Sequence, residues 1–171
     1  MFDGLGMLKT LIIFQNKNLR IIDNDVFSNL IQLQKLGLTE ACIEFIDKSL
    51  FSNLINLKYL YLHSNRIESI EENSFSNLHS LESLDLSGNR LTSLSAKSFV
   101  GLDNLKELSF SNNKLFYFDL NIFDNIGKIE KIYLKGNPIM NKKNLQANLM
   151  RGSGTLSTQT TILNLKNKLG F

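Results

Sequence analysis

Residues capable of catalysis or metal binding are few in this chain. It holds two histidines, His63 and His79, and a single cysteine, Cys42. One cysteine excludes an internal disulfide and a zinc site built from several thiolates. A serine-histidine-aspartate triad needs its members within hydrogen-bond reach, and the repeat described below separates the two histidines onto opposite sides of one unit. We therefore expect neither nucleophilic catalysis nor a metal site.

Asp85 and Glu107 are the carboxylates best spaced for acid–base chemistry, because the repeat puts them on adjacent strands. Both are expected on an open curved surface, where nothing in the sequence would exclude water or shift a pKa. No phosphate-cradling loop and no cofactor motif is present. The sequence therefore predicts a protein that is not an enzyme and needs no cofactor.

The charge and hydropathy of the chain argue against two classes of partner. The 19 basic and 16 acidic residues leave a net charge of +3, whereas nucleic-acid-binding proteins concentrate Lys and Arg on one face. No apolar run approaches the length that spans a bilayer, and the residues after Met1 do not form a signal peptide. We predict a protein partner, no nucleic acid and no membrane span.

An internal repeat positions the side chains discussed above. The first apolar residue of each unit recurs at steps of 25, 24, 24, 24 and 24 residues, at Leu8, Leu33, Leu57, Leu81, Leu105 and Ile129. Further positions keep the same phase, as in Leu60, Leu62, Asn65, Ile67, Ile70, Phe75 and Leu78. A fixed period of this kind indicates a solenoid, in which each unit buries its apolar face against its neighbours.

Each unit contains a short stretch that alternates between apolar and polar residues, which is typical of a half-buried strand. The strands are expected to centre on Ile12, Gly37, Tyr61, Asp85, Ser109 and Tyr133. A long return segment follows each strand and cannot double back as a hairpin does. Consecutive strands must therefore be parallel and joined by right-handed connections.

The unit resembles the leucine-rich repeat family, which reads L-x-x-L-x-L-x-x-N-x-L, and its typical 24-residue subclass, which adds L-x-x-x-x-F-x-x-L. The resemblance covers residues 2 to about 139 and extends to the repeat regions of Toll-like receptors and Slit-type guidance proteins. It implies an α/β fold, a right-handed solenoid curved like a horseshoe. One short parallel strand per repeat would line the concave face, with loops or short helical turns on the convex face.

Two sets of residues share a phase and are expected to hold the solenoid together. A phenylalanine spine behind the sheet should comprise Phe27, Phe51, Phe75, Phe99 and Phe123, with Phe2 in phase before them. The resemblance also implies an asparagine ladder, whose amides bond backbone groups of adjacent turns, made of Asn16, Asn65, Asn89, Asn113 and Asn137. We interpret both sets as structural rather than catalytic.

The pattern departs from the family at two neighbouring turns. Ala41 stands where the second unit would have its ladder asparagine, and Asn18 is an extra residue in the first unit. Cys42, next to Ala41, is expected to be a small buried hydrophobe, with a reactive thiol as the alternative.

The ends of the chain are also unusual. Residues 1–139 should form about six units that start inside a repeat, without the polar cap that a solenoid end normally needs. This suggests a fragment, a truncated product, or a chain that continues or pairs at that end. Residues 140–171 leave the repeat frame, and this tail either caps the last repeat or is disordered.

Side chains between the buried leucines should point to the concave face. The predicted partner-binding residues are Lys35, Tyr59, Tyr61, His63, Asp85, Glu107, Lys131, Tyr133 and Lys135. Their aromatic rings are of the kind enriched in interface hot spots, and the change of sign along the face suits a polar protein surface. The alternative is that good strand formers simply fill solvent-facing positions.

The sequence therefore predicts a non-catalytic module that binds a macromolecular partner through its concave face. The resemblance favours an extracellular, receptor-like role in innate immunity or cell adhesion, although a signal peptide, a cysteine-rich cap and Asn-x-Ser/Thr sites are missing. Two alternatives remain open. One is a structural element that self-associates through uncapped solenoid ends, and the other is a cytoplasmic scaffold.

Overall fold

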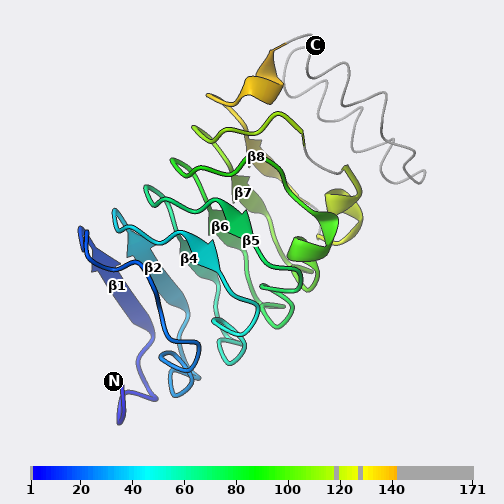
Figure 1. Ribbon diagram of the computed structural model, residues 1–171. Coiled ribbons are helices and arrows are strands. Elements are labelled where there is room, and N and C mark those ends of the chain that lie inside the picture. The colour runs from blue at the N-terminus through cyan, green and yellow to red at the C-terminus, as the bar shows by residue number, and fades with distance from the viewer. Residues whose placement is uncertain (1, 118–119, 127–128, 142–171) are drawn as a thin grey trace.

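The computed structural model describes residues 2–117, 120–126 and 129–141. Its main feature is a six-stranded parallel sheet in the order β1-β2-β4-β6-β7-β8 (Figure 1). These strands are β1 (Thr10–Phe14), β2 (Lys35–Thr39), β4 (Tyr59–Tyr61), β6 (Ser83–Asp85), β7 (Glu107–Ser109) and β8 (Lys131–Tyr133). A second sheet pairs β3 (Phe45–Ile46) with β5 (Ser69–Ile70), again in parallel. The predicted solenoid is confirmed.

The 24-residue period of the sequence is also the pairing register of the sheet. Along one column, Gly37 pairs with Tyr61, Tyr61 with Asp85, Asp85 with Ser109 and Ser109 with Tyr133. The neighbouring leucine in each strand points into the core, and Leu60 is fully buried while Leu84 is 1% exposed. Equal spacing therefore stacks like residues on like residues, so that each unit completes the core of the next.

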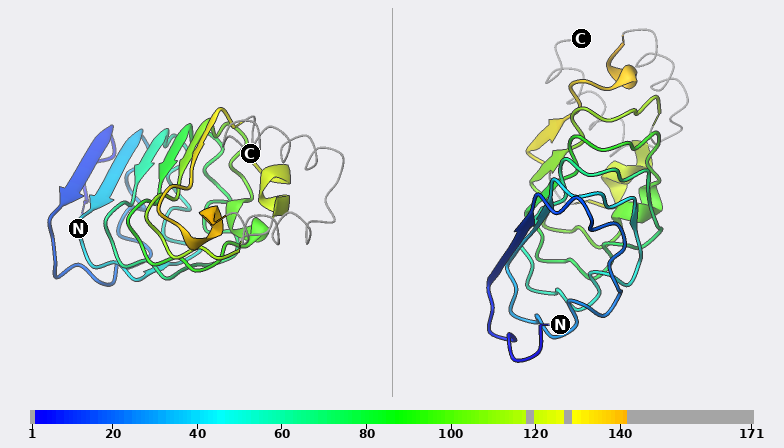
Figure 2. Two further views of the ribbon diagram at one scale, coloured as in Figure 1. Left: turned by 90° about the horizontal axis from the view of Figure 1, so that it is seen from above. Right: turned by 60° about the vertical axis from the view of Figure 1, so that its left-hand side comes forward.

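The return segments are built from tight turns rather than long helices. The backbone N–H of Leu54 bonds the carbonyl of Phe51 at 3.1 Å, and that of Leu57 bonds the carbonyl of Leu54 at 2.9 Å. Such three-residue spacing gives turns and short 3-10 helices, namely η1 (Ala96–Phe99), η2 (Leu120–Asp124) and η3 (Pro138–Met140). The described residues contain no α-helix. Figure 2 shows the strands along one side of the solenoid and η1 and η2 away from them.

A residue in the left-handed backbone conformation reverses the direction of the chain after each strand of the main sheet. The positions with positive φ that precede the ladder position are Gln15, Glu40, Ser64, Gly88, Asn112 and Gly136. In the four turns from Ser64 onwards, the asparagine that follows then enters the core. The Oδ1 atom of Asn65 accepts the N–H of Ile43 at 3.3 Å, and its Nδ2 donates to the carbonyls of Leu38 at 2.7 Å and Leu62 at 3.0 Å. Asn89, Asn113 and Asn137 repeat this arrangement.

Asn16 does not join the buried ladder, contrary to the expectation from the sequence. Its side chain is exposed and has no hydrogen bond among the described residues. The physical reason is that each buried ladder asparagine bonds the turn before it, and no turn of residues 2–117, 120–126 or 129–141 packs against that side of Asn16. In the second turn, Ala41 and Cys42 are buried, and the backbone N–H of Cys42 bonds the carbonyl of Leu19 at 3.1 Å.

The phenylalanines of the spine are all buried: Phe27, Phe51, Phe75, Phe99 and Phe123. The ring of Phe75 lies 6.1 Å from that of Phe51 and 5.9 Å from that of Phe99, measured between centroids. Phe2 is partly buried and stacks on Phe27 at 6.1 Å. Phe118, which keeps the apolar repeat phase, lies outside the described residues, as do residues 142–171 of the predicted tail.

The first turn is much less buried than the turns that follow. Leu11 and Ile13 of β1 are only partly buried, although they occupy the phase of the fully buried core leucines. On the other face of the same strand, Ile12 is 46% exposed and Phe14 is 62% exposed. Among the described residues, this end of the solenoid therefore presents an apolar surface beside an edge of β1 that pairs with no other strand.

Candidate partner-binding surface

The concave face consists of columns of side chains that run across the strands. The first column contains Lys35, Tyr59, Ser83, Glu107 and Lys131, and the second contains Gly37, Tyr61, Asp85, Ser109 and Tyr133. A third column lies just beyond the strands and holds His63, Ser87, Ser111 and Lys135. The repeat thus brings all nine predicted residues to one face. Lys131, Tyr133 and Lys135 are exposed, and the other six are half-buried.

Lys35 and the tyrosines of β4 form one group at the start of this face. The Nζ atom of Lys35 lies 5.3 Å from the ring centroid of Tyr59 and 6.0 Å from that of Tyr61. At these distances the ammonium is attracted to the negative face of the rings, by about 0.5–1 kcal/mol at an exposed site. The sequence predicted both the lysine and the tyrosines, but only the register shows that they interact.

Glu107 and Lys131 form a second group on β7 and β8. The Nζ of Lys131 donates to the Oε1 of Glu107 at 2.5 Å. This hydrogen bond, followed by the charge of Glu107, raises the pKa of Lys131 above its ordinary value. Lys131 was predicted to bind a partner, and its charge is directed towards Glu107 on the adjacent strand.

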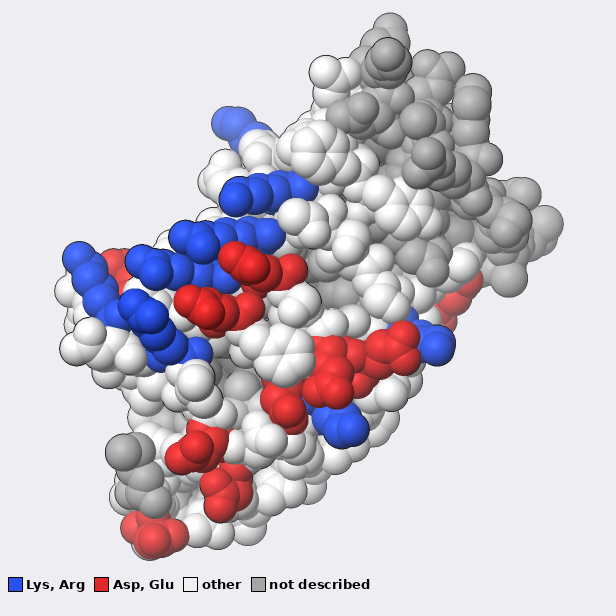
Figure 3. Space-filling view, viewed as in Figure 1, with Lys and Arg blue, Asp and Glu red and all other residues white. Residues whose placement is uncertain are grey.

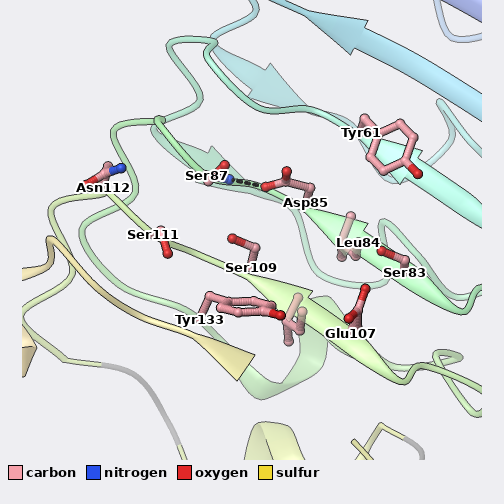
Figure 4. A pocket seen from close by; sticks show the side chains of 11 residues that line it. Tyr61, Ser83, Leu84, Asp85, Ser87, Glu107, Ser109, Ser111, Asn112 and Tyr133 are labelled. Atoms are coloured by element: carbon pink, nitrogen blue, oxygen red, sulfur yellow. Dashed lines mark hydrogen bonds between the residues drawn. The ribbon is translucent and has the colours of Figure 1, made fainter. Parts of the chain in front are cut away.

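Between these two groups the face is hollowed. The hollow has a volume of about 410 Å³ and is lined by Tyr61, Ser83, Leu84, Asp85, Ser87, Glu107, Leu108, Ser109, Ser111, Asn112 and Tyr133 (Figure 4). Its walls are the rings of Tyr61 and Tyr133, and serines make much of its floor. Burial, followed by the negative charges of neighbouring groups that include Asp85 and Glu107, raises the pKa of Tyr61. The hollow is therefore aromatic at its sides and negative at its centre.

Asp85 is the carboxylate at the centre of this hollow. Its Oδ1 accepts the backbone N–H of Ser87 at 2.9 Å, which orients the side chain. It has no ion-pair partner among the described residues. Glu107, by contrast, is neutralised by Lys131. The two carboxylates that lie on adjacent strands thus differ in whether the fold itself supplies a cation.

The two histidines lie in different parts of the repeat and contact different neighbours. The Nδ1 of His63 lies 3.3 Å from the hydroxyl of its neighbour Ser64, while that of His79 lies 2.6 Å from the Oδ2 of Asp103 in the return segments. No group of three His, Cys, Asp or Glu side chains suited to a metal ion occurs among the described residues. In the same residues, no helix is long and apolar enough to cross a bilayer.

Sequence reasoning missed an ionic row along the rim of this face. Glu82 lies 3.7 Å from the Nζ of Lys58 and 2.8 Å from that of Lys106. The signal was available, because Lys58, Glu82, Lys106 and Glu130 share one phase and alternate in sign. Asn112 was missed for another reason, since its place in the hollow depends on the left-handed turn that it forms.

Charges of both signs are also present on the face of the molecule that Figure 3 shows. In the view of Figure 3, Lys and Arg gather along one edge while Asp and Glu gather nearer the middle. Nucleic-acid-binding proteins instead present a continuous basic face. The face shown in Figure 3 is not continuously basic.

Comparisons with known proteins agree with this architecture. A family model described as leucine rich repeat matches residues 31–91 and 81–139. Among solved structures, one chain of the Toll–Spatzle complex, described as a molecular hub in Drosophila development and innate immunity, is similar with a TM-score of 0.74 and 24% sequence identity. The match covers 86% of this chain and 20% of that chain, so this chain spans about a fifth of its length. The search of curated proteins gave no match.

Proposed function

The chain belongs to the leucine-rich repeat family, and we propose that it is a non-catalytic recognition module that binds a protein partner through its concave face. One observation carries the proposal. The hollow on β4, β6, β7 and β8 combines two aromatic walls, a floor of small side chains and two carboxylates, those of Asp85 and Glu107. Proteins of this family generally bind other proteins.

The composition of the face supports a protein partner. Tyr is enriched at interfaces because its ring buries a large apolar area while its hydroxyl keeps a polar contact. Three of the four tyrosines of the chain, Tyr59, Tyr61 and Tyr133, are on this face. Charges of both signs beside them favour a partner with a mixed surface over a uniformly charged polymer.

We further propose that the module acts outside the cell, in receptor-like recognition connected with innate immunity or cell adhesion. The support is the likeness in fold to a chain of the Toll–Spatzle complex. A cytoplasmic scaffold is the alternative. Expressing the complete gene and digesting intact cells with protease distinguishes the two when the repeat region itself is detected with an antibody, since only an extracellular repeat region is degraded before lysis.

The binding proposal is tested with the triple variant Tyr59→Ala/Tyr61→Ala/Lys131→Ala. Partners captured by the wild-type chain from extracellular fluid and from cytosol are identified, and their affinities for purified variants are measured by calorimetry. We expect at least a tenfold loss of affinity for the triple variant. A matched variant on the return segments, Lys48→Ala/His79→Ala/Lys97→Ala, should bind as the wild type does. Equal affinity of both variants would reject the concave face as the binding surface.

A second candidate function is self-association through the first turn. It is favoured by the exposure of Ile12 and Phe14 beside the outer edge of β1, which pairs with no strand in the described part of the chain and can pair with another strand. Sedimentation velocity should then give a concentration-dependent dimer that Phe14→Lys abolishes and the concave triple variant leaves intact. A monomer over the whole concentration range would exclude this candidate.

A further inference from the structure

We propose that the hollow between Tyr61 and Tyr133 receives one basic side chain, an arginine or a lysine of the partner protein, whose charge pairs with Asp85. The proposal rests on the proposed function, because it identifies which group of the partner enters the same face. The proposed function names only the concave surface, whereas this proposal names one subsite on that surface and the group that occupies it.

The first argument is the distribution of cations over the concave face. Lys131 neutralises Glu107, and Lys35 lies over the rings of Tyr59 and Tyr61. Both lysines belong to the first column, and each already has an intramolecular partner. Asp85, in the second column, is half-buried. Its carboxylate accepts the N–H of Ser87 and has no cation partner among the described residues. The fold thus supplies a cation for Glu107 and leaves Asp85, which lines the same hollow, without one among the described residues.

The second argument is the geometry of the walls. Tyr61 and Tyr133 are separated by three strand intervals in the second column, with Asp85 and Ser109 on the strands between them. At ~4.8 Å per interval their backbones are roughly 14 Å apart. The ring on each side leaves an opening that suits one long side chain, and Figure 4 shows Asp85 and Ser109 between the two rings. The volume of about 410 Å³ is near the small end of the range for ligand pockets, roughly 300–1,000 Å³.

The third argument is chemical. An arginine guanidinium or a lysine ammonium is attracted to the faces of tyrosine rings and forms strong charge-assisted hydrogen bonds with a carboxylate. The hydroxyls of Ser83, Ser109 and Ser111 line the same hollow and can accept the remaining N–H donors of such a group. Lys35 over Tyr59 and Lys131 on Glu107 are two examples of these contacts on this same face.

The test uses the whole chain and a defined probe, the tripeptide acetyl-Gly-Arg-Gly-amide, with the lysine peptide beside it. The chain has no tryptophan and four tyrosines, so tyrosine fluorescence reports mainly on this face, and amide chemical shifts of Ser83, Asp85 and Ser109 locate the contact. We expect saturable binding with a Kd on the order of 1 mM, as for a single contact. The citrulline peptide, which has the shape of arginine without its charge, should bind at least tenfold more weakly.

Two variants of equal size complete the experiment. Asp85→Asn keeps an oxygen for the N–H of Ser87 and should weaken binding of the arginine peptide at least tenfold, while Asp103→Asn in the return segments should leave it unchanged. Circular dichroism checks that both are folded. If Asp85→Asn binds as tightly as the wild type, or if citrulline binds as well as arginine, the proposal is wrong.

The outcomes separate this subsite from the proposed function. A neutral disaccharide that moves the same amide resonances when the arginine peptide moves none would assign the hollow to carbohydrate and overturn the proposal. Peptide binding that depends on Asp85, in a chain whose concave triple variant keeps full affinity for the captured partner, would retain the subsite and reject the proposed function. Loss of partner binding in the triple variant, without any binding of the peptide to the wild type, would retain the proposed function and reject the subsite.

Discussion

The central turns and the first turn of the solenoid carry the same sequence signals but differ in structure. In the central turns, Asn65 and Asn89 are buried and bond both their own turn and the one before. In the first turn, Asn16 has the same phase and is exposed. The apolar positions differ in the same way, because Leu60 is fully buried whereas Leu11 is only partly so.

This difference shows that a residue in a solenoid obtains its environment from its neighbours. The 24-residue pattern fixes which way a side chain points, but a turn on each side is needed before that side chain is buried. Stability should therefore be unevenly distributed, with identical substitutions costing more in the centre than at the first turn. Four pairs of variants test this contrast.

The largest difference is expected between Phe75→Ala and Phe2→Ala. Phe75 is fully buried between two rings, so its removal should lower the free energy of unfolding by about 3–5 kcal/mol. Phe2 has one ring neighbour, is partly exposed and loses less apolar contact, so the cost should be less than half as great. Urea denaturation monitored by circular dichroism measures both. Equal costs would contradict the neighbour argument.

A second contrast is between Gly101→Ala and Gly4→Ala. Both glycines have positive φ, +89° and +80°, which costs an alanine roughly 1–2 kcal/mol. A Cβ on Gly101 would also lie 2.3 Å from the backbone oxygen of Ser76, whereas one on Gly4 would meet no atom within 4 Å. We expect Gly101→Ala to cost about 2–5 kcal/mol, since overpacking adds to the backbone strain. Thermal unfolding midpoints that are lowered equally would show that the clash is relieved.

The ladder gives a third contrast, between Asn89→Ala and Asn16→Ala. Removing the Asn89 amide leaves the N–H of Ile67 and the carbonyls of Leu62 and Leu86 without this partner. Unsatisfied buried groups cost about 1–3 kcal/mol each, and partial relaxation should keep the total near that range. Asn16→Ala, at an exposed position, should change stability by no more than about 0.5 kcal/mol. Hydrogen exchange at Ile67 should rise only in the first variant.

The smallest effect is electrostatic and depends on pH. The hydrogen bond from Lys106 lowers the pKa of Glu82, and the charge of Lys106 acts in the same direction. A lowered pKa in the folded state means that this contribution is present above the unfolded value, about 4.3, and is lost as the pH falls through the folded pKa. The stability difference between the wild type and Glu82→Gln should thus disappear in acid. Lys9→Gln, in the same phase of the first turn, should show no such pH dependence.

Much of the fold could be predicted from the sequence because its information is periodic. The step from Leu57 to Leu81 to Leu105 predicted the parallel strands, their register and the stacking of the phenylalanines. The candidate surface was predicted in outline for the same reason, since Tyr61, Asp85 and Tyr133 lie between buried leucines. The loops and short helical turns expected on the convex face are also observed, as the tight turns and 3-10 helices of the described return segments.

Relations between columns required the tertiary structure. The contact of Lys35 with the rings of Tyr59 and Tyr61, and the pairing of Lys131 with Glu107, depend on how long side chains lean across strands. The hollow arises because small side chains at Ser83 and Ser109 lie between larger ones on neighbouring strands. No single unit contains that information.

The sequence by itself determined the period of this leucine-rich repeat, the direction in which each side chain points and the residues available on the concave face. Only the tertiary structure decided which of those residues are buried and which charges are paired. It also placed Asp85 between two tyrosine rings with no cation partner among the described residues. The physical reason is that orientation follows from local backbone geometry, which repeats every 24 residues. Burial and charge pairing depend on adjacent turns, and those differ between the centre of the solenoid and its first turn.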